Sequence, residues 1–382
     1  MNLDTCLALH GTDLAKITAA VDAEVGLQED DLLFASGSLT TGLGNCHSDL
    51  DLFLITRRDL SAKADFDQAI TFRLGGLQVD LEFVAPSYIV DLVDRLRACH
   101  ASVVAGEERK SLNIPPRTLD FLHRVQTGRA MAGHARFNAL RDSFEAGHLR
   151  AMIVGRSAVI ASSEQEDFVG YLQENDFDSA RFAGSRMLDA AIDACLAALG
   201  NTMVKEKWRM RLVERLATPS WDADFPGGPL LPSLREAYLQ LHYWPRGNVD
   251  VEAHACSLVN FVNRCIPWAQ RRVYGLRTTK PMQRLPLERE MGESLPRLAS
   301  HVALRYSQRE LIAFSHSRPA VIELNESAHD ALACFDGRTS PSALAVRIAS
   351  STAPAMPLSV ARRSVDHLAQ VLFAAGFLDM AV

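Results

Sequence analysis

The chain has 382 residues, with 40 Lys and Arg against 46 Asp and Glu, a formal net charge of −6, 48% apolar residues and 23% charged residues. This mixture is typical of a globular protein and excludes a collagen, a coiled-coil rod and wholesale disorder. The mild acidic balance argues against a general nucleic-acid-binding protein, so no nucleic-acid partner is expected. At about 150 residues per domain, the length predicts two or three domains.

The seven cysteines are scattered and contain no CxxC pair, which argues against a disulfide framework or a zinc site. The first residues lack the basic n-region of a signal peptide. No run of about 18 apolar residues is present, so no membrane span or membrane partner is expected. We therefore expect a cytoplasmic protein with reduced thiols.

The first predicted domain covers residues 1–115 and mixes short strands with helices. Strands are predicted at 32–35 and 51–56, where the second (DLFLIT) is apolar at nearly every position, as in a strand buried on both faces. Runs 71–74 and 77–84 flank Gly75-Gly76, which predicts a hairpin because both turn positions tolerate φ > 0. A helix is predicted to follow at 86–100.

The second predicted domain, residues 116–274, is a helical bundle. Met187, Leu188, Ile192 and Leu196 recur at helical spacing, and Asp178 or Ser179 is the expected N-cap of their helix. Its histidines show no metal-ligand spacing and are interpreted as surface or satisfied core residues: His123, His134, His148, His242 and His254. Residues 275–299, with prolines and many charges, are predicted to be a linker.

Residues 300–382 are predicted to form a small module of their own. A hairpin is expected from strands 311–315 and 320–324, after which Asn325 caps a helix that ends near Gly337. Further helices are expected from Pro341, which suits the first helical position, and over 358–375. The whole chain is therefore predicted to have an α+β fold with a mixed sheet in its first domain.

Acidic residues and a Gly-Ser turn mark a candidate site in the first domain. Asp49 and Asp51 lie two positions apart beside one strand, and Asp80 and Glu82 do the same on another, so each pair shares a face. Unpaired buried carboxylates are costly, and a divalent cation such as Mg²⁺ is the usual compensation. Gly37 and Ser38, at the end of the first strand, provide a turn that admits anionic phosphate oxygens. Together these features predict attack on a nucleoside triphosphate, with two metal ions acting on an in-line displacement.

These residues resemble the signature of the polymerase-β-type nucleotidyltransferase superfamily. The signature comprises Gly37-Ser38, Gly42 and Ser48-Asp49-Leu50-Asp51, with Asp49 eleven positions after Ser38. The resemblance implies that Gly37, Ser38 and Ser48 bind the nucleotide and that Asp49 and Asp51 hold two Mg²⁺ ions. Asp80 matches the third carboxylate best, with Glu82 as a second candidate. The segment Leu39–His47 departs from the superfamily, since it lacks the usual small residues and Arg.

A basic, Trp-containing segment in the second domain, residues 201–211, supplies candidate phosphate contacts. In this superfamily a helical domain often closes the nucleotide cleft, and Lys205 or Lys207 is predicted to reach the β- or γ-phosphate. The spacing does not choose between the two lysines. The alternative interpretation is a solvated basic face with Trp208 in the core.

The C-terminal stretch from Val321 to Ala349 resembles the PqqD-like family, also called RiPP recognition elements. The features that carry the resemblance are an apolar strand, Leu324-Asn325, an amphipathic helix and Asp336-Gly337-Arg338-Thr339 before a second capped helix. The family is a small winged helix whose members bind the leader of a ribosomal precursor peptide by adding it to a sheet edge. The resemblance implies that the 311–324 hairpin edge and the 358–376 helix bind such a leader. An ordinary structural or dimerisation module is the alternative.

The leading hypothesis joins both resemblances: an Mg²⁺-dependent nucleotidyltransferase that moves a nucleoside monophosphate from an NTP to a precursor peptide held by the C-terminal module, with release of pyrophosphate. A tethered recognition module would raise the local concentration of the peptide. The alternatives are a small-molecule nucleotidyltransferase of the antibiotic-modifying type and a catalytically silent scaffold that presents a leader peptide. The base of the NTP, the acceptor group and the oligomeric state have no signature in the sequence.

Overall fold

The computed structural model describes residues 1–59, 69–216, 233–244, 251–276, 294–307, 310–337, 339–351 and 355–379. The chain divides into two compact units. The N-terminal unit comprises Met1–His100, Ile114–Leu149 and Thr202–Trp208, and the C-terminal unit comprises Ala101–Asn113, Arg150–Asn201 and Arg209–Val382. Most of the predicted linker, residues 277–293, lies outside the described residues.

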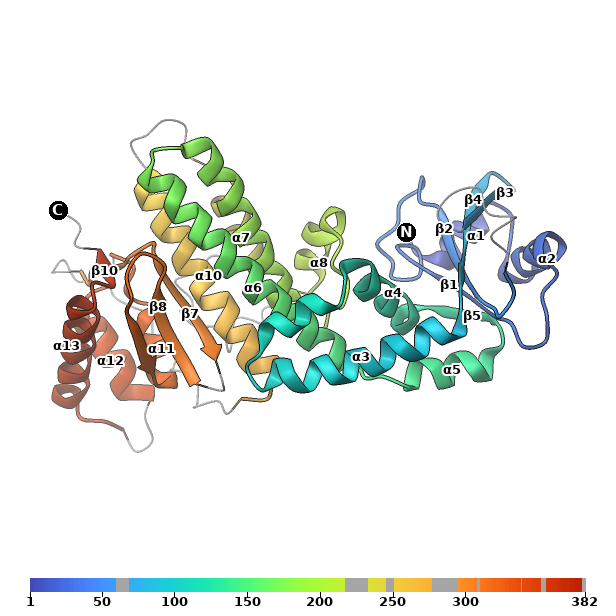
Figure 1. Ribbon diagram of the computed structural model, residues 1–382. Helices are drawn as coiled ribbons and strands as arrows, with labels where there is room; N and C mark the ends of the chain where they lie inside the picture. Colours follow the sequence, from blue (N-terminus) through green and yellow to red (C-terminus); the bar gives the residue numbers. More distant parts are fainter. Residues whose placement is uncertain are drawn as a thin grey trace. The chain divides into compact units, whose positions relative to one another are not determined.

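A mixed five-stranded sheet forms the centre of the N-terminal unit (Figure 1). Its strands run in the order β3-β4-β2-β1-β5, where β2 and β4 are parallel and the other neighbours are antiparallel. The strand bounds are β1 Leu32–Ser36, β2 Leu50–Ile55, β3 Ala69–Leu74, β4 Leu77–Val84 and β5 Arg129–Ala132. The predicted strands and hairpin are confirmed, and Gly75 and Gly76 adopt φ values of 58° and 87° in the turn. β5 was not predicted.

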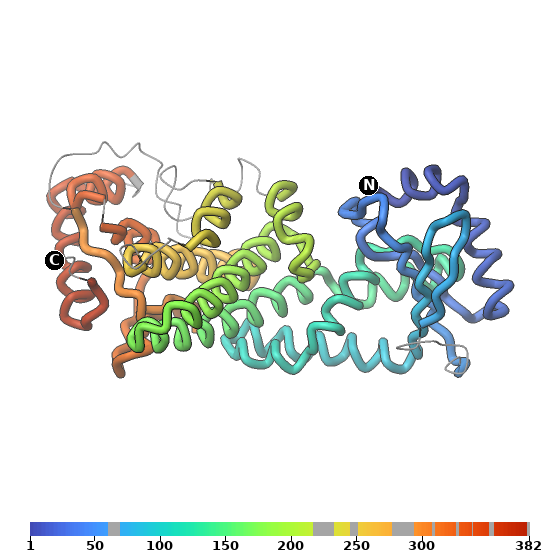
Figure 2. Tube along the Cα trace, turned by 90° about the horizontal axis from the view of Figure 1, so that it is seen from above, coloured from blue at the N-terminus to red at the C-terminus, as the bar shows by residue number. Residues whose placement is uncertain are grey.

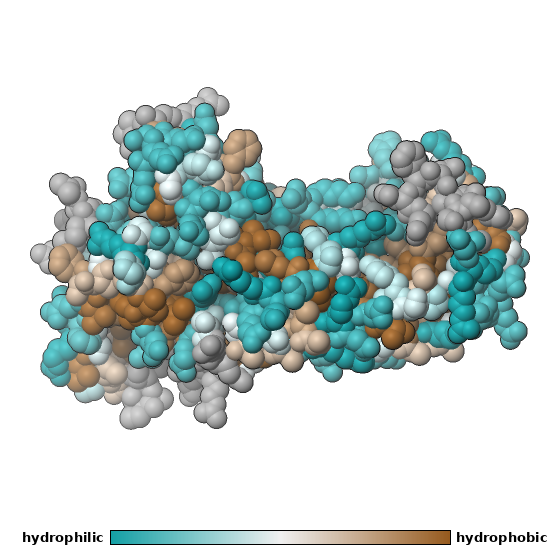
Figure 3. All heavy atoms as spheres, in the orientation of Figure 1, coloured by the Kyte–Doolittle hydropathy of each residue, from teal (hydrophilic) through white to brown (hydrophobic). Residues whose placement is uncertain are grey.

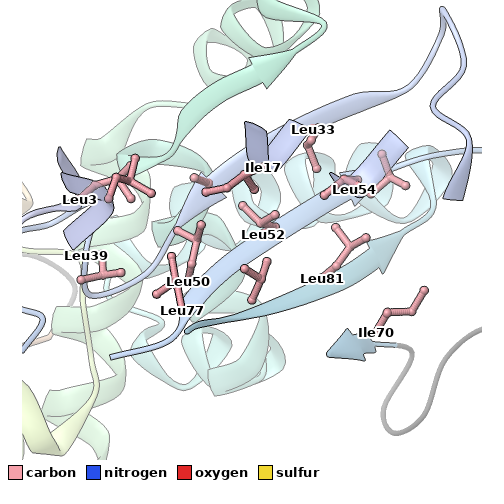
Figure 4. Packing of buried hydrophobic residues seen from close by; sticks show 14 of the residues in the cluster. Leu3, Ile17, Leu33, Leu39, Leu50, Leu52, Leu54, Ile70, Leu77 and Leu81 are labelled. Carbon is pink, nitrogen blue, oxygen red and sulfur yellow. The ribbon is translucent and has the colours of Figure 1, made fainter. Parts of the chain in front are cut away.

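One face of this sheet packs against the first two helices, α1 (Leu3–Leu9) and α2 (Leu14–Val25). Every second residue of β1, β2 and β4 enters this apolar cluster, as the alternation of side chains along a strand requires. Figure 4 shows the packing of Leu33, Leu50, Leu52, Leu54 and Leu81 from the strands with Leu3 and Ile17 from the helices.

The opposite face of the sheet carries aromatic residues and packs against α4 (Pro116–Thr127) and α5 (His134–Asp142). Phe34 of β1 stacks on Phe53 of β2 with ring centroids 5.2 Å apart, and Phe53 meets Phe121 of α4 at 5.7 Å. Phe137 of α5 contacts Phe34 at 4.9 Å. These contacts hold α4 across the face that also bears Asp51 and its neighbours.

Long helices make up much of the C-terminal unit, as predicted for the middle of the chain. α7 and α10 pack along each other, and α6 runs beside them from Arg150 onward (Figures 1 and 2). The N-cap of α7 is Asp176, whose side chain accepts a hydrogen bond from the Ser179 backbone N–H at 3.1 Å, so the predicted cap at 178 or 179 is wrong by two or three positions. The helix bounds are α3 Pro86–Val104, α6 Ala146–Gln173, α7 Phe177–Ala198, α8 Arg209–Leu216, α9 Leu234–His242 and α10 Val251–Val273. No helix in the described part of the chain is long and apolar enough to cross a bilayer.

Two small sheets and three helices make up the remainder of the C-terminal unit over its described residues. The predicted hairpin is confirmed as β8 and β9, and Asn325 caps α11 by accepting from the Ala328 N–H at 2.8 Å. β7 was not predicted, and it makes the sheet three-stranded in the order β7-β8-β9. The bounds are β6 Arg297–Leu298, β7 Val302–Ser307, β8 Glu310–Ser315, β9 Val321–Leu324, β10 Leu378–Asp379, α11 Glu326–Leu332, α12 Pro341–Ser351 and α13 Leu358–Ala374.

Side-chain amides of α10 cover the outer edge of β7. Asn263 donates to the Val302 carbonyl at 2.7 Å and accepts from the Leu304 N–H at 2.9 Å. Gln270 accepts from the Tyr306 N–H at 2.9 Å. These amides satisfy backbone groups that a further strand would otherwise pair. β9 stands at the other edge and pairs with β8 alone among the strands of the described residues.

Candidate functional site

Three carboxylates gather where β2 and β4 lie side by side. Asp51 of β2 and Asp80 of β4 are register partners in the parallel pair, and Asp49 immediately precedes β2. Neighbouring strands are about 4.8 Å apart, so the two backbones hold the side chains of Asp51 and Asp80 close together. The Asp80 carboxyl is also among the neighbouring groups that raise the pKa of Asp49.

The carboxylates of Asp51 and Asp80 affect the ionisation of Asp49. Partial burial raises the pKa of the Asp49 carboxyl, and the neighbouring carboxylates of Asp51 and Asp80 raise it further. A like charge nearby disfavours ionisation, and here two such charges act on one carboxyl. The site therefore has an excess of negative charge that a bound cation would relieve.

Fixed partners hold Asp80 and Asp51 in different orientations. Thr71 donates to Asp80 Oδ1 at 2.9 Å, and Gln78 donates to the same oxygen at 3.2 Å. Asp51 Oδ1 instead lies 3.0 Å from Nη1 of Arg124 on α4. Consistent with this, no group of three or more His, Cys, Asp or Glu side chains among the described residues is placed so that it could hold a metal ion.

Gly37 is required by the close approach of Asp51. Its φ of 88° lies in the left-handed region, and a Cβ at this position would be 1.9 Å from Asp51 Oδ2. The turn that follows is closed by hydrogen bonds from the Leu43 and Gly44 N–H groups to the Ser38 carbonyl at 2.8 and 2.9 Å. Gly37 therefore permits both the turn and the position of the carboxylate beside it.

The charged residues of α4 were not predicted as part of the site. Arg124 Nε donates to Asp120 Oδ2 at 2.9 Å, and the Arg124 carbonyl accepts from Ser36 Oγ at 2.9 Å, which ties α4 to the end of β1. Burial of Asp120 disfavours its charge, but Arg124 and Lys205 outweigh this effect and hold the pKa of Asp120 below its ordinary value. The spacing of 120 and 124 is that of a helical ion pair, a signal too common to indicate a site.

His123 also belongs to this region, contrary to its interpretation as a surface or satisfied core histidine. Its Nδ1 makes a 2.7 Å hydrogen bond with Thr202 Oγ1, while its buried Nε2 has no hydrogen-bond partner among the described residues. Burial lowers the pKa of His123 to about 4, and the nearby positive charges of Arg124 and Lys205 add to this effect against the opposing charge of Asp120. The imidazole is therefore neutral near pH 7.

These groups surround one pocket in the N-terminal unit, with a cavity volume of about 140 Å³. Lys205 lies 3.3 Å from Asp120, whereas Lys207 lies 5.2 Å from the ring centroid of Trp208. The lining residues are Gly37, Ser38, Asp49, Asp51, Asp120, His123, Arg124, Met203, Lys205, Lys207 and Trp208.

Three of the predicted site residues are absent from this lining. Ser48 accepts a hydrogen bond from the Asn45 N–H at 2.9 Å and so stabilises the loop before β2. Asp80 is engaged by Thr71 and Gln78, as described above. Glu82 follows Asp80 on the same face of β4, where burial raises the pKa of its carboxyl although Arg124 acts in the opposite direction.

The donor set fits a hard divalent cation. Asp49, Asp51 and Asp80 offer carboxylate oxygens without sulfur or imidazole nitrogen, which is the chemistry that Mg²⁺ prefers over Zn²⁺. Burial, followed by the charges of Asp51 and Asp80, raises the pKa of Asp49, and a bound cation would favour its ionised form. Asp51 would complete the set by releasing Arg124.

Comparisons with known proteins add a distant similarity of fold. No protein-family model matches the chain, and no curated protein matches it. Among solved structures, the chain is similar to a nucleotidyltransferase-like protein from Exiguobacterium sibiricum 255-15, with 12% sequence identity, a TM-score of 0.35, and coverage of 69% of this chain and 75% of that chain. A similarity of this size does not decide an activity.

Proposed function

We propose that the protein is a nucleotidyltransferase that moves a nucleoside monophosphate from an NTP to an acceptor. The observation that carries the proposal is the register of Asp51 with Asp80, with Asp49 directly before β2, beside the Gly37-Ser38 turn. One pocket brings this turn and two of the acids together with Lys205, Lys207 and Arg124. Acids for a metal ion and cations for phosphates thus lie around the same space.

The proposed reaction is a displacement at the α-phosphorus of the NTP. An acceptor oxygen forms a bond to this phosphorus, the bond to the oxygen bridging to the β-phosphate breaks, and pyrophosphate leaves with the bonding electron pair. The proton of the acceptor passes to a carboxylate, for which we propose Asp80. Hydrogen bonds from Thr71 and Gln78 hold Asp80 in position for this role.

Asp49, Asp51 and Asp80 would hold Mg²⁺, one or two ions, which would neutralise the charge on the transferring phosphate. The other groups of the pocket act on the substrate directly. Gly37, which lacks a side chain, lets the triphosphate approach the turn, and Ser38 lines the pocket beside it. Lys205 and Lys207 would bind the β- and γ-phosphates as point charges.

We further propose that the acceptor is a ribosomally made precursor peptide whose leader binds the C-terminal unit. β9 supports this proposal because its outer edge pairs with no other strand of the described residues, whereas amides cover β7. Large apolar side chains are exposed on this part of the chain: Val321 at 66%, Phe373 at 59% and Leu358 at 54%. Figure 3 shows apolar surface over the region of the C-terminal sheet and its helices. An extended peptide would add to β9 through its backbone and place apolar side chains against α13.

Mass spectrometry tests both parts of this proposal. The full chain is incubated with Mg²⁺, each of the four common NTPs in turn, and candidate precursor peptides, and the mass of one nucleotide is expected on the peptide. Asp51→Asn should abolish this transfer but leave peptide binding intact. Transfer to hydroxylated small molecules in the absence of peptide would overturn the peptide proposal alone, and peptide binding without any transfer would overturn the enzymatic one.

A matched pair of variants tests whether the outer edge of β9 binds the peptide. Val321→Asp places a charge beside the proposed strand addition and should weaken peptide binding about tenfold by fluorescence anisotropy. Leu9→Asp is the control, because Leu9 is 62% exposed on α1 of the other unit. Equal peptide binding by both variants would contradict the proposal that the peptide adds to β9.

A further inference from the structure

Arg124 is a buried cation with one firm and one loose contact. The residue is 7% exposed, and its Nε donates to Asp120 in an aligned hydrogen bond of 2.9 Å. Its Nη1 lies 3.0 Å from Asp51 Oδ1, but the N–H is not aligned with that oxygen, so Nη1 makes no hydrogen bond among the described residues. Arg124 is therefore anchored by Asp120, while its contact with Asp51 is chiefly one of charge.

The surroundings of Arg124 keep it charged. Burial disfavours the guanidinium charge, but the adjacent carboxylates of Asp51 and Asp120 outweigh burial and raise the pKa of Arg124. The Cζ atom of Arg124 also lies over the Phe53 ring, at 5.1 Å from its centroid. The result is a permanent positive charge beside the three carboxylates.

We propose that Arg124 acts as the internal counter-ion of the carboxylate site. When no divalent ion is bound, Arg124 neutralises Asp51. When Asp51 binds an ion, the guanidinium shifts as a unit toward the nucleotide phosphates in the same pocket, with Asp120 as its remaining carboxylate partner. This inference rests on the proposed function, because it assumes that Asp51 is a metal ligand and that a triphosphate enters the pocket.

The chemistry of the groups supports such an exchange. A divalent ion and a guanidinium compete for one carboxylate, and the ion carries the larger charge. A guanidinium also has a planar set of donors that suits phosphate oxygens, so a released Arg124 has a second partner within the pocket that it already lines. Asp120 remains the partner of Arg124 in both states, and its Oδ2 also lies 3.3 Å from Lys205 Nζ. Metal and nucleotide binding should consequently reinforce each other.

Two binding measurements on the full chain distinguish this role from a structural one. Mn²⁺ binding without nucleotide is measured by the EPR signal of free Mn²⁺, and binding of an α,β-methylene NTP analogue is measured by calorimetry at saturating Mn²⁺. Arg124→Gln should raise the affinity for Mn²⁺ about tenfold and lower the affinity for the analogue about tenfold. A merely structural residue would lower both affinities when it is replaced.

Asp120→Asn provides the opposite test. Without the charge of Asp120, Arg124 should hold Asp51 more strongly, so Mn²⁺ affinity should fall by about fivefold. Arg124→Lys retains the positive charge, so it should bind the NTP analogue more tightly than Arg124→Gln does. Arg117→Gln removes one positive charge from an exposed position of the same helix and should leave both affinities nearly unchanged.

The outcomes separate this inference from the proposed function. If Asp51→Asn abolishes Mn²⁺ binding but Arg124→Gln does not tighten it, the counter-ion role is wrong and the metal site stands. If Asp51→Asn leaves Mn²⁺ binding unchanged, the metal site itself is wrong. Should Arg124→Gln fail to fold, as monitored by circular dichroism, the Asp120→Asn variant decides the matter, and an unchanged Mn²⁺ affinity in that variant would overturn the inference.

Discussion

Asp51 and Asp80 face each other in register across the parallel pair of β2 and β4. A shift of one residue in this pairing would move either carboxylate to the opposite face, into the apolar cluster with α1 and α2. The apolar neighbours Leu50, Leu52 and Leu81 therefore fix the position of the acids, because they must stay buried on their own face. The core of the N-terminal unit and the geometry of its site depend on the same register.

The first prediction concerns the third carboxylate. Asp51→Asn and Asp80→Asn should each reduce pyrophosphate release by about 100-fold or more, since each removes a charge from the proposed metal site. Glu82→Gln should reduce it by less than about fivefold, because Glu82 lies two residues beyond the register partner of Asp51. Turnover with a coupled phosphate assay checks this order. A larger loss in Glu82→Gln than in Asp80→Asn would reverse the assignment.

Gly37 provides the second prediction. Gly37→Ala combines a left-handed φ with a Cβ only 1.9 Å from Asp51 Oδ2, so it should displace the carboxylate and destabilise the fold by about 2–4 kcal/mol. Gly26→Ala is the matched control, since Gly26 has a φ of 66° with nothing within 4 Å of the added Cβ. It should cost only about 1 kcal/mol from backbone strain. Urea unfolding of the two variants measures the difference, and equal losses would show that the contact with Asp51 has no influence.

The third prediction is a pH dependence from His123. The pKa of this side chain is about 4 in the folded protein against an ordinary value of 6.5. Between these values the unfolded chain binds a proton that the folded chain does not, so stability falls as the pH drops from about 6.5 to about 4. The difference corresponds to about 3 kcal/mol.

His123→Gln should remove this dependence. The free energy of unfolding of the wild type minus that of the variant should be constant above pH 7 and fall by up to about 3 kcal/mol by pH 4, as measured by urea titration. His134→Gln, at an exposed position of α5, serves as the control. A flat difference for His123→Gln would mean that the pKa of His123 is the same in the folded and the unfolded protein.

Glu108 in the C-terminal unit provides the fourth prediction, with the opposite sign. Burial raises the pKa of its carboxyl to about 7, and its Oε1 accepts a hydrogen bond from Gln270 at 3.1 Å. The folded chain therefore holds a proton that the unfolded chain has lost above its ordinary value of 4.5. The stabilisation is complete below about pH 4.5 and is lost as the pH rises through 7, by about 3 kcal/mol.

Glu108→Gln should retain the buried contact and remove this pH dependence. Its stability relative to the wild type should therefore increase between pH 4.5 and 8 in thermal or urea unfolding. Glu107→Gln is the control because Glu107 is exposed and adjacent in sequence. An unchanged difference across this range would contradict a raised pKa at Glu108.

Local patterns were enough to predict much of the N-terminal sheet. The run after Asp51 is apolar on both faces, and Gly75-Gly76 tolerates the left-handed conformations of a tight turn, so strand and hairpin follow from neighbouring residues. The N-cap of α7 was missed because Asp176, Asp178 and Ser179 are all suitable caps within four positions, and the backbone alone decides which side chain bonds. β7 was missed because its edge is completed by amides of α10 from far away in the sequence.

By itself, the sequence determined which acids share a strand face and that a glycine-serine turn precedes them, because alternation along a strand and glycine at a turn are properties of adjacent residues. Only the tertiary structure decided which cations accompany them. Ser36 and Arg124 are separated by 88 positions, yet their hydrogen bond helps to fix α4 over the carboxylates and so brings Arg124 to Asp51. Packing likewise placed Lys205 on Asp120 and Lys207 beside Trp208, since long-range contacts arise from the burial of apolar faces that no local spacing records.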